Sequence, residues 1–197
     1  MLSVVIATDE SERALVPTLA ALVPGATAGL VREVILADAG SRDATAEIAD
    51  VAGCRMLVSA APLAARMAQA AETARAPWLL FLDAGAVPQA GWVEETSRFI
   101  EAASLAGQAD AVAAVFRAVT PSLVPAAPLR EAMALLTQAL GLSRRASHGL
   151  LIGKDLYRRM GGLDAVGRKS ESDGIGQVVR RLGRRRIVTL RCGAVGA

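Results

Sequence analysis

The sequence is poor in the residues that build several common kinds of site. It contains one histidine, His148, and two cysteine residues, Cys54 and Cys192. One imidazole and two widely separated thiols cannot supply the ligands of a zinc site, and two distant cysteine residues do not make a disulfide framework. We therefore expect both cysteine residues to be free thiols in a reducing compartment.

Aromatic residues are also scarce, at 3% of the chain. Proteins that bind nucleic acid usually combine a basic surface with stacking aromatic side chains, so we expect no nucleic-acid partner. The net charge is +3, and much of this excess comes from a C-terminal cluster of Arg180, Arg181, Arg184, Arg185 and Arg186. The cluster fits a solvated helix end, and its alternative is contact with phosphate groups or an anionic membrane surface.

Long hydrophobic runs are absent as well. None reaches the roughly 20 apolar residues that a membrane-spanning helix needs. The N-terminal run MLSVVIAT is too short for a signal peptide, and Asp9 and Glu10 follow it directly. We expect a cytoplasmic protein, with peripheral contact at the inner face of the membrane as the alternative that the arginine cluster leaves open.

The residues that are present favour one α/β domain. The chain has 197 residues, of which 53% are hydrophobic, which is enough for a single core. Apolar runs typical of buried strands alternate with helical patterns, and this alternation predicts a mainly parallel sheet with helices on both faces. The predicted strands are Leu2–Ala7, Val31–Ala37, Cys54–Val58, Trp78–Leu82, 110–119 and 186–192, with a shorter one after His148.

Helical patterns fill the intervals between these strands. The first begins at Ser11 or Glu12 and breaks at Pro24-Gly25, and the second is capped by Asp43 or Thr45, with Ile48 and Val51 facing inward. The remaining predicted helices are 63–75, 88–105, 129–142 and 171–182, with a short helix that ends at Gly161-Gly162.

Three aspartate residues come directly after predicted strands. They are Asp9, Asp38 and Asp83. Parallel sheets bind ligands beyond the carboxyl ends of their strands, so we expect the three carboxylates to gather at one ligand-binding edge. Each of them also fits a simpler reading as a turn residue or helix cap.

Four segments of the chain follow one another in a recognisable order: SVVIATDESERALVPTLAAL, EVILADAGSRDATAEIA, PWLLFLDAGAVPQAGWV, and SHGLLIGKDLYRRMGGLD followed by ESDGIGQVVRRLGR. Taken together, they resemble family 2 glycosyltransferases with the GT-A fold, of the short bacterial type. The resemblance implies a single GT-A domain over 1–197, with a nucleotide-binding half (1–105) and an acceptor half (106–197). It also implies transfer of a sugar from a nucleotide-diphosphate sugar to an acceptor hydroxyl, with inversion.

The same resemblance assigns the site residues. It implies nucleotide binding by Asp9, Glu10, Asp38, Arg66 and Asp83. A catalytic base is implied at Asp173 or Glu171, at the start of a helix, and His148 resembles a residue near the acceptor. Asp83 matches the first carboxylate of the family's Asp-x-Asp motif, which makes it a metal ligand as well.

Gly85 stands where the second carboxylate of that motif should be, and three interpretations follow. A divalent cation, Mn²⁺ or Mg²⁺, is held by Asp83 together with Glu171, Asp173 or substrate phosphates. Alternatively, basic side chains neutralise the diphosphate without a metal. In the third interpretation the chain is a non-catalytic protein that binds a nucleotide or a partner. A weaker alternative is a nucleotidyltransferase, which also uses carboxylates at the edge of an α/β sheet.

Overall fold

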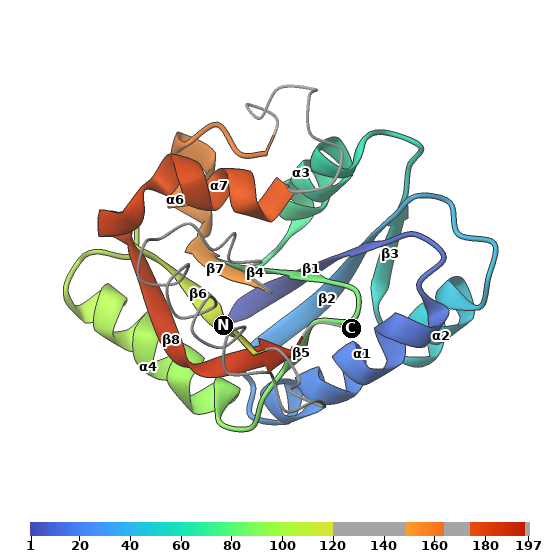
Figure 1. Ribbon diagram of the computed structural model, residues 1–197, viewed down its shortest axis with the longest axis horizontal. Coiled ribbons are helices and arrows are strands. Elements are labelled where there is room, and N and C mark those ends of the chain that lie inside the picture. The colour runs from blue at the N-terminus through green and yellow to red at the C-terminus, as the bar shows by residue number, and fades with distance from the viewer. Residues whose placement is uncertain (120–148, 164–173, 196–197) are drawn as a thin grey trace, which may run out of the picture.

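The computed structural model describes residues 1–119, 149–163 and 174–195. Within these residues, one eight-stranded sheet has the strand order β3-β2-β1-β4-β7-β6-β8-β5, and helices cover both of its faces (Figure 1). The α/β fold predicted from the alternation of apolar runs and helical patterns is confirmed.

The sheet is mainly parallel, as predicted. Its strands are β1 (Leu2–Thr8), β2 (Val31–Asp38), β3 (Arg55–Val58), β4 (Trp78–Asp83), β5 (Val87–Pro88), β6 (Ala113–Val119), β7 (Leu150–Gly153) and β8 (Ile187–Val195). Strands β1 to β4 are parallel, β7 runs antiparallel to both β4 and β6, and β8 is parallel to β6. Strands β6 and β8 therefore point in the same direction as β1 and β4.

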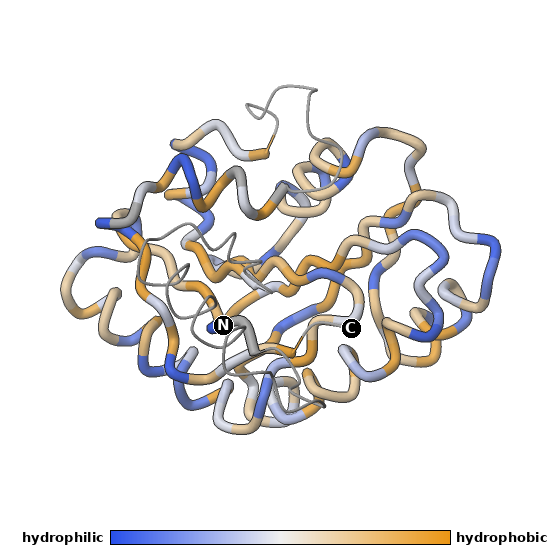
Figure 2. Tube along the Cα trace, in the orientation of Figure 1, coloured by the Kyte–Doolittle hydropathy of each residue, from blue (hydrophilic) through white to orange (hydrophobic). Residues whose placement is uncertain are grey.

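The helices form two layers. They are α1 (Glu12–Thr27), α2 (Thr45–Val51), α3 (Leu63–Thr73), α4 (Trp92–Leu105), α6 (Lys154–Arg159) and α7 (Gly174–Leu182), with a 3₁₀ turn η1 (Arg184–Arg186). Helices α1, α2 and α4 pack on one face of the sheet, and α3, α6 and α7 pack on the other (Figure 1). The hydrophobic strands lie between these two layers (Figure 2).

The two layers divide the strand side chains by their alternation. Val4 and Ile6 of β1 belong to the core beneath α1, while Val5 belongs to the core beneath α3. A strand that is covered on both faces reads as a continuous apolar run, which explains why LSVVIA could be recognised as a buried strand.

Helix α1 is longer than predicted. It continues through Pro17 and Pro24 and ends at Thr27, so the predicted break at Pro24-Gly25 is wrong. Each proline removes one backbone hydrogen bond, but tertiary packing holds the helix together here. The indole Nε1 of Trp92 donates to the Ala21 carbonyl (3.0 Å), and a Cβ at Gly25 would lie 2.5 Å from Cη2 of the same indole.

Two other expectations need correction. The helix predicted from residue 88 begins at Trp92, because Val87 and Pro88 pair with β8 as β5. Val51 was predicted to face inward but is 84% exposed, because α2 ends there. The helix predicted at 129–142 and the first residues of the helix predicted at 171–182 lie outside the described residues.

Both cysteine residues are free thiols, as expected from their spacing. Burial raises the pKa of the Cys54 thiol. Burial and the nearby Glu95 carboxylate raise the pKa of Cys192 to about 11. Since the reactive form of cysteine is the thiolate, neither side chain is a nucleophile near neutral pH.

Candidate active site at the carboxyl edge of the sheet

The ends of β1, β2 and β4 lie side by side at one edge of the sheet, called the carboxyl edge below. Thr8 pairs with Asp38, and Ala7 pairs with Asp83. Asp9 follows the last residue of β1. The backbone thus brings the three aspartate residues that were predicted from separate strands to the same edge.

The carboxylate of Asp38 is buried and accepts four hydrogen bonds. Its Oδ1 accepts from Oγ1 of Thr8 (2.8 Å) and Oγ of Ser41 (2.6 Å). Its Oδ2 accepts from the backbone N–H groups of Gly40 (2.7 Å) and Ser41 (2.8 Å). Burial opposes ionisation, but the bonds from Ser41, Thr8 and Gly40 outweigh it and hold the pKa of Asp38 below its ordinary value. The carboxylate is fully used in ordering the loop that follows β2.

The loops after β1 and β2 are bonded to each other. Oγ of Ser41 accepts from the backbone N–H of Glu10 (2.9 Å), and Oε1 of Glu10 accepts from the N–H of Arg42 (3.0 Å). Two further bonds join the same loops: Asp43 Oδ2 accepts from the N–H of Glu12, and Oε2 of Glu12 accepts from the N–H of Ala44. Glu10 has a φ of 46°, which is unusual for a residue with a side chain, and these bonds stabilise that conformation.

Asp38 and Asp83 point to opposite faces of the sheet. Residues paired across parallel strands project to the same face, and successive residues alternate. Thr8 and Asp38 therefore lie on the α1 face, whereas Ala7 and Asp83 lie on the α3 face. The expectation that the three aspartate residues gather at one edge of the sheet is thus confirmed by the strand register, but Asp38 and Asp83 project to opposite faces of that edge.

Arg66 of α3 lies on the same face as Asp83 and is only 7% exposed. Its Nη1 donates to the carbonyls of Thr8 (3.0 Å) and Ala37 (2.7 Å), and its Nε donates to the carbonyl of Ala61 (3.1 Å). The guanidinium therefore joins the ends of β1 and β2 to the segment before α3. Its Nη2 takes no part in these three bonds, so a positive charge with a remaining donor lies at the carboxyl edge.

We expect Arg66→Lys to lower the free energy of unfolding by about 2 kcal/mol, because one ammonium cannot reach three carbonyls that are arranged for a planar guanidinium. Urea unfolding of the wild type and the variant measures this difference. Arg32→Lys is the matched control, since Arg32 is exposed. Equal unfolding midpoints for the wild type and Arg66→Lys would show that the three bonds do not hold the edge together.

The turn after β4 explains how the chain accommodates the missing second carboxylate. Gly85 is buried, has a φ of 92°, and donates its N–H to Oγ1 of Thr18 (2.9 Å). Glycine adopts this left-handed backbone without the steric cost that a side chain would bring. An aspartate placed here would have to change the turn, so Asp83 is the carboxylate that β4 offers at this edge.

The described residues alone do not fit a metal ion. They contain no group of three or more His, Cys, Asp or Glu side chains that could hold one. Asp83 is exposed and is the single described residue that the sequence assigned as a metal ligand. The other two residues that the sequence offers as ligands, Glu171 and Asp173, lie outside the described residues.

Three of the predicted site residues, His148, Glu171 and Asp173, lie outside the described residues. The structure does describe the neighbour of the first of them. A Cβ at Gly149 would lie 2.7 Å from Phe116 and 2.8 Å from Leu82. Since Phe81 pairs with Leu150, the strand that follows His148 begins level with the end of β4.

The sequence did not reveal the roles of Ser41 and Thr18. Ser41 bonds to Asp38 and to Glu10, and Thr18 bonds to Gly85. Thr18 is the one fully buried polar residue in the apolar stretch of α1, and that isolation is a signal that could have marked it.

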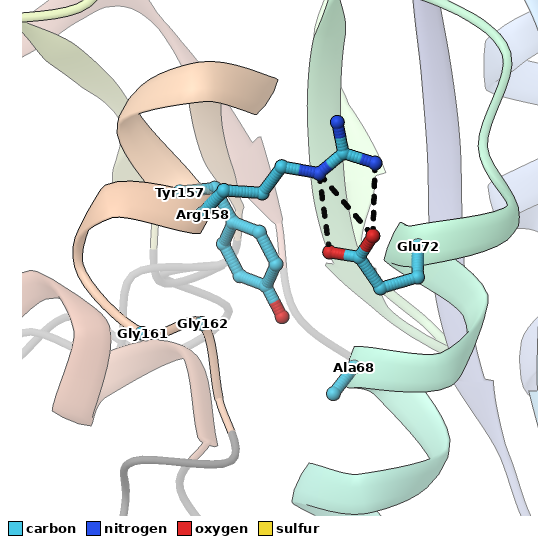
Figure 3. Close-up of a pocket in the computed structure, with 6 residues that line it drawn as sticks. All are labelled: Ala68, Glu72, Tyr157, Arg158, Gly161 and Gly162. Atoms are coloured by element: carbon cyan, nitrogen blue, oxygen red, sulfur yellow. Dashed lines mark hydrogen bonds and ion pairs between the residues drawn. The ribbon is translucent and has the colours of Figure 1, made fainter.

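A separate cavity of about 100 Å³ lies between α3 and α6 (Figure 3). It is lined by Ala68, Glu72, Tyr157, Arg158, Gly161 and Gly162. Glu72 accepts from Arg158 at 2.9 Å, and Tyr157 Oη accepts from the N–H of Leu163 (3.1 Å). These contacts fasten the C-terminal half of α3 to α6, one to two turns away from Arg66, so the cavity is not part of the carboxyl edge.

Comparison with known proteins identifies the family to which the chain belongs. The family described as Glycosyl transferase family 2 matches residues 3–157. The chain is therefore a member of glycosyltransferase family 2, and its fold is GT-A. None of the curated proteins matches the chain in sequence.

Solved structures agree on the fold. The S. aureus TarS 1-349 structure matches with a TM-score of 0.68 at 14% identity, covering 100% of this chain and 60% of that one. Glucosyl-3-phosphoglycerate synthase from Mycobacterium tuberculosis, in complex with Mn²⁺, UDP and glucosyl-3-phosphoglycerate, matches with a TM-score of 0.60 at 18% identity, covering 96% and 68%. The chain thus spans about three fifths of the TarS fragment.

Proposed function

We propose that this protein transfers a sugar from a nucleotide-diphosphate sugar to an acceptor hydroxyl, with inversion at the anomeric carbon. The observation that carries the proposal is the placement of Asp83 and the buried Arg66 on one face of the carboxyl edge. Membership of family 2 supports it, as does the likeness to a synthase whose structure contains UDP.

The chemistry needs positive charge where the diphosphate leaves. Negative charge builds on the leaving group as the glycosidic bond breaks, and fixed cations stabilise it. Arg66 is held by three carbonyls, so its charge is already in place before the substrate binds. We infer that it orients the ends of β1 and β2 and supplies part of that stabilisation.

Asp38 contributes through the loop that it orders. Its carboxylate is saturated by Thr8, Gly40 and Ser41. We therefore infer that the nucleotide meets the 39–43 loop and the exposed Asp9, with Asp38 beneath them. Glu10 acts in the same way, because it fixes the N–H of Arg42.

The acceptor hydroxyl must lose its proton as it attacks, and a carboxylate is the usual base. Asp173 or Glu171 stays the proposed base, and His148 the proposed neighbour of the acceptor. With them, residues 106–197 stay the proposed acceptor half, and 1–105 the proposed nucleotide-binding half.

A divalent cation stays a proposal. It would supply charge neutralisation at the diphosphate. A related structure contains Mn²⁺ with UDP, but the described residues of this chain contain no group of three or more side chains that could hold such an ion. Substrate phosphates or Glu171 and Asp173 would have to complete its coordination.

The two alternatives from the sequence are less well supported. A non-catalytic role would not account for the buried guanidinium of Arg66 at this edge. It would also not account for the hydrogen bonds between the loops that follow β1 and β2. A nucleotidyltransferase would release pyrophosphate, whereas a glycosyltransferase releases a nucleoside diphosphate, so the released product separates the two.

Nothing in the described residues has both the length and the hydropathy of a membrane-crossing helix. A cytoplasmic location with peripheral membrane contact stays a prediction, and it is independent of the glycosyl-transfer chemistry.

The proposal is tested by incubating the protein with UDP- and GDP-sugars, with and without Mn²⁺, and measuring released nucleoside diphosphate and thermal unfolding. We expect a nucleoside diphosphate at about 100 times its dissociation constant to stabilise the fold by about 2.7 kcal/mol. Absence of both stabilisation and release with every nucleotide would overturn the proposal, and pyrophosphate release would favour the nucleotidyltransferase.

A further inference from the structure

The edge of the sheet opposite the candidate active site, called the amino edge below, carries a concentration of positive charge. Ile187, at the start of β8, pairs with Ala113, Ala113 pairs with Ile152, and Ile152 pairs with Leu79 near the start of β4. The beginning of β8 therefore lies at the amino edge. The 3₁₀ turn η1 and the end of α7 lead directly into it, at the left of Figure 1.

Four exposed arginine side chains make up what we call the arginine surface: Arg180, Arg181, Arg185 and Arg186. Residues 174–195 contain six arginine residues and no acidic residue. The buried face of α7 consists of Ile175, Val178 and Leu182, so Arg180 and Arg181 lie on its solvent side. Within residues 174–195, the positive charge is thus not balanced by any acidic residue of the same segment.

Among the described residues, no acidic side chain forms an ion pair with Arg181, Arg185 or Arg186. Arg181 donates from Nη1 to the backbone carbonyl of Met160 (3.2 Å), which fixes its position without cancelling its charge. Within the part of the chain that the structure describes, neither Arg185 nor Arg186 forms an ion pair, whereas the nearby Arg158 and Arg159 pair with Glu72 and Asp110. The arginine surface therefore differs from other basic residues at the same edge.

Exposed apolar side chains lie at the same amino edge. Val188, two residues after Arg186, is 44% exposed. Leu105, the last residue of α4, is 90% exposed, and the 106–112 segment connects it to β6, whose first residue Ala113 pairs with Ile187. Basic side chains interspersed with exposed aliphatic ones are typical of surfaces that bind anionic bilayers.

We propose that the arginine surface, together with Val188 and Leu105, binds the protein to an anionic lipid bilayer. A nucleic-acid partner is disfavoured, because none of the large exposed apolar side chains in the described residues is aromatic and single-stranded nucleic acid is held by aromatic stacking. The inference is independent of the proposed glycosyl transfer.

The geometry has a consequence for the orientation of the bound protein. The two edges are separated by the length of a strand of seven residues, such as β1, which is about 20 Å. With the amino edge on the bilayer, the carboxyl edge faces away from it. Lipid binding and substrate binding would therefore be separable, and substitutions in the arginine surface should leave nucleotide binding unchanged.

The experiment is sedimentation of the protein with vesicles of phosphatidylcholine alone, and with vesicles of phosphatidylcholine mixed with phosphatidylglycerol. We expect binding only to the mixed vesicles, and weaker binding as salt rises through about 0.15 M. The variant Arg185→Gln/Arg186→Gln should bind the mixed vesicles at least about tenfold more weakly than the wild type. The variant Leu105→Gln reports the apolar contribution, with a smaller loss expected.

The matched control is Arg13→Gln/Arg98→Gln, which removes the same charge from exposed positions on α1 and α4. Its binding should equal that of the wild type, and thermal unfolding checks that each variant is folded. Equal binding to neutral vesicles, or equal losses in both double variants, would overturn the proposal. Retention on an acidic protein matrix without vesicle binding would overturn it in favour of a protein partner.

Discussion

Replacing Asp83 with asparagine is expected to lower the rate of sugar transfer by at least about 100-fold, because the proposed divalent cation would lose its carboxylate ligand and with it part of the positive charge that neutralises the diphosphate. Asp83 is exposed at the end of β4, and no second carboxylate follows it in the turn. Because Gly85 occupies the other position of the motif, no neighbouring side chain on that turn can take over the role of Asp83. Initial rates with a saturating nucleotide-sugar measure the effect.

The control for this substitution is Asp50→Asn. Asp50 is also exposed, but it lies in the last turn of α2, away from the carboxyl edge. Both variants should unfold at the temperature of the wild type, because neither side chain is buried. A full rate for Asp83→Asn would mean that the carboxylate on β4 does not take part in the reaction.

Replacing Asp38 with alanine is expected to lower the free energy of unfolding by about 3 kcal/mol, because buried donors are left without their acceptor. The donors are the hydroxyls of Thr8 and Ser41 and the N–H groups of Gly40 and Ser41. The loop that Asp38 orders should loosen, so nucleotide binding should weaken as well. Asp38→Asn, which keeps the shape and one acceptor oxygen, should lose less of both.

Acid titration separates the charge of Asp38 from its shape. The pKa of Asp38 is below its ordinary value in the folded state, so its contribution to stability is present above the ordinary pKa and disappears as pH falls through the lowered one. Asp38→Asn lacks this contribution at every pH. The difference in unfolding free energy between the wild type and Asp38→Asn should therefore shrink on acidification, and a constant difference would contradict the role of the carboxylate charge.

The sequence predicted the sheet well because its strands carry strong local signals. A strand buried on both faces is a continuous apolar run, and LSVVIA and WLLFLD both have this pattern. The break predicted at Pro24-Gly25 failed because tertiary contacts with Trp92 outweigh local propensity. Strand β5 has only two residues, Val87 and Pro88, which is too short to carry a pattern.

The candidate site was predicted less completely. Strand ends revealed which acidic residues reach the carboxyl edge, but not the face to which each one points. That depends on where each strand ends in its alternation and on the register between strands, as the pairs Thr8 with Asp38 and Ala7 with Asp83 show. The three-carbonyl contact of Arg66 joins positions up to 58 residues apart in sequence, which no local pattern contains.

The central claim is that a nucleotide diphosphate binds at the carboxyl edge on the α3 face. The most direct measurement is a crystal structure of the protein soaked with UDP and Mn²⁺. We predict density for the diphosphate between Arg66 and Asp83, with the nucleoside against the 39–43 loop. Density for the diphosphate on the α1 face, or in the cavity between α3 and α6, would contradict the account.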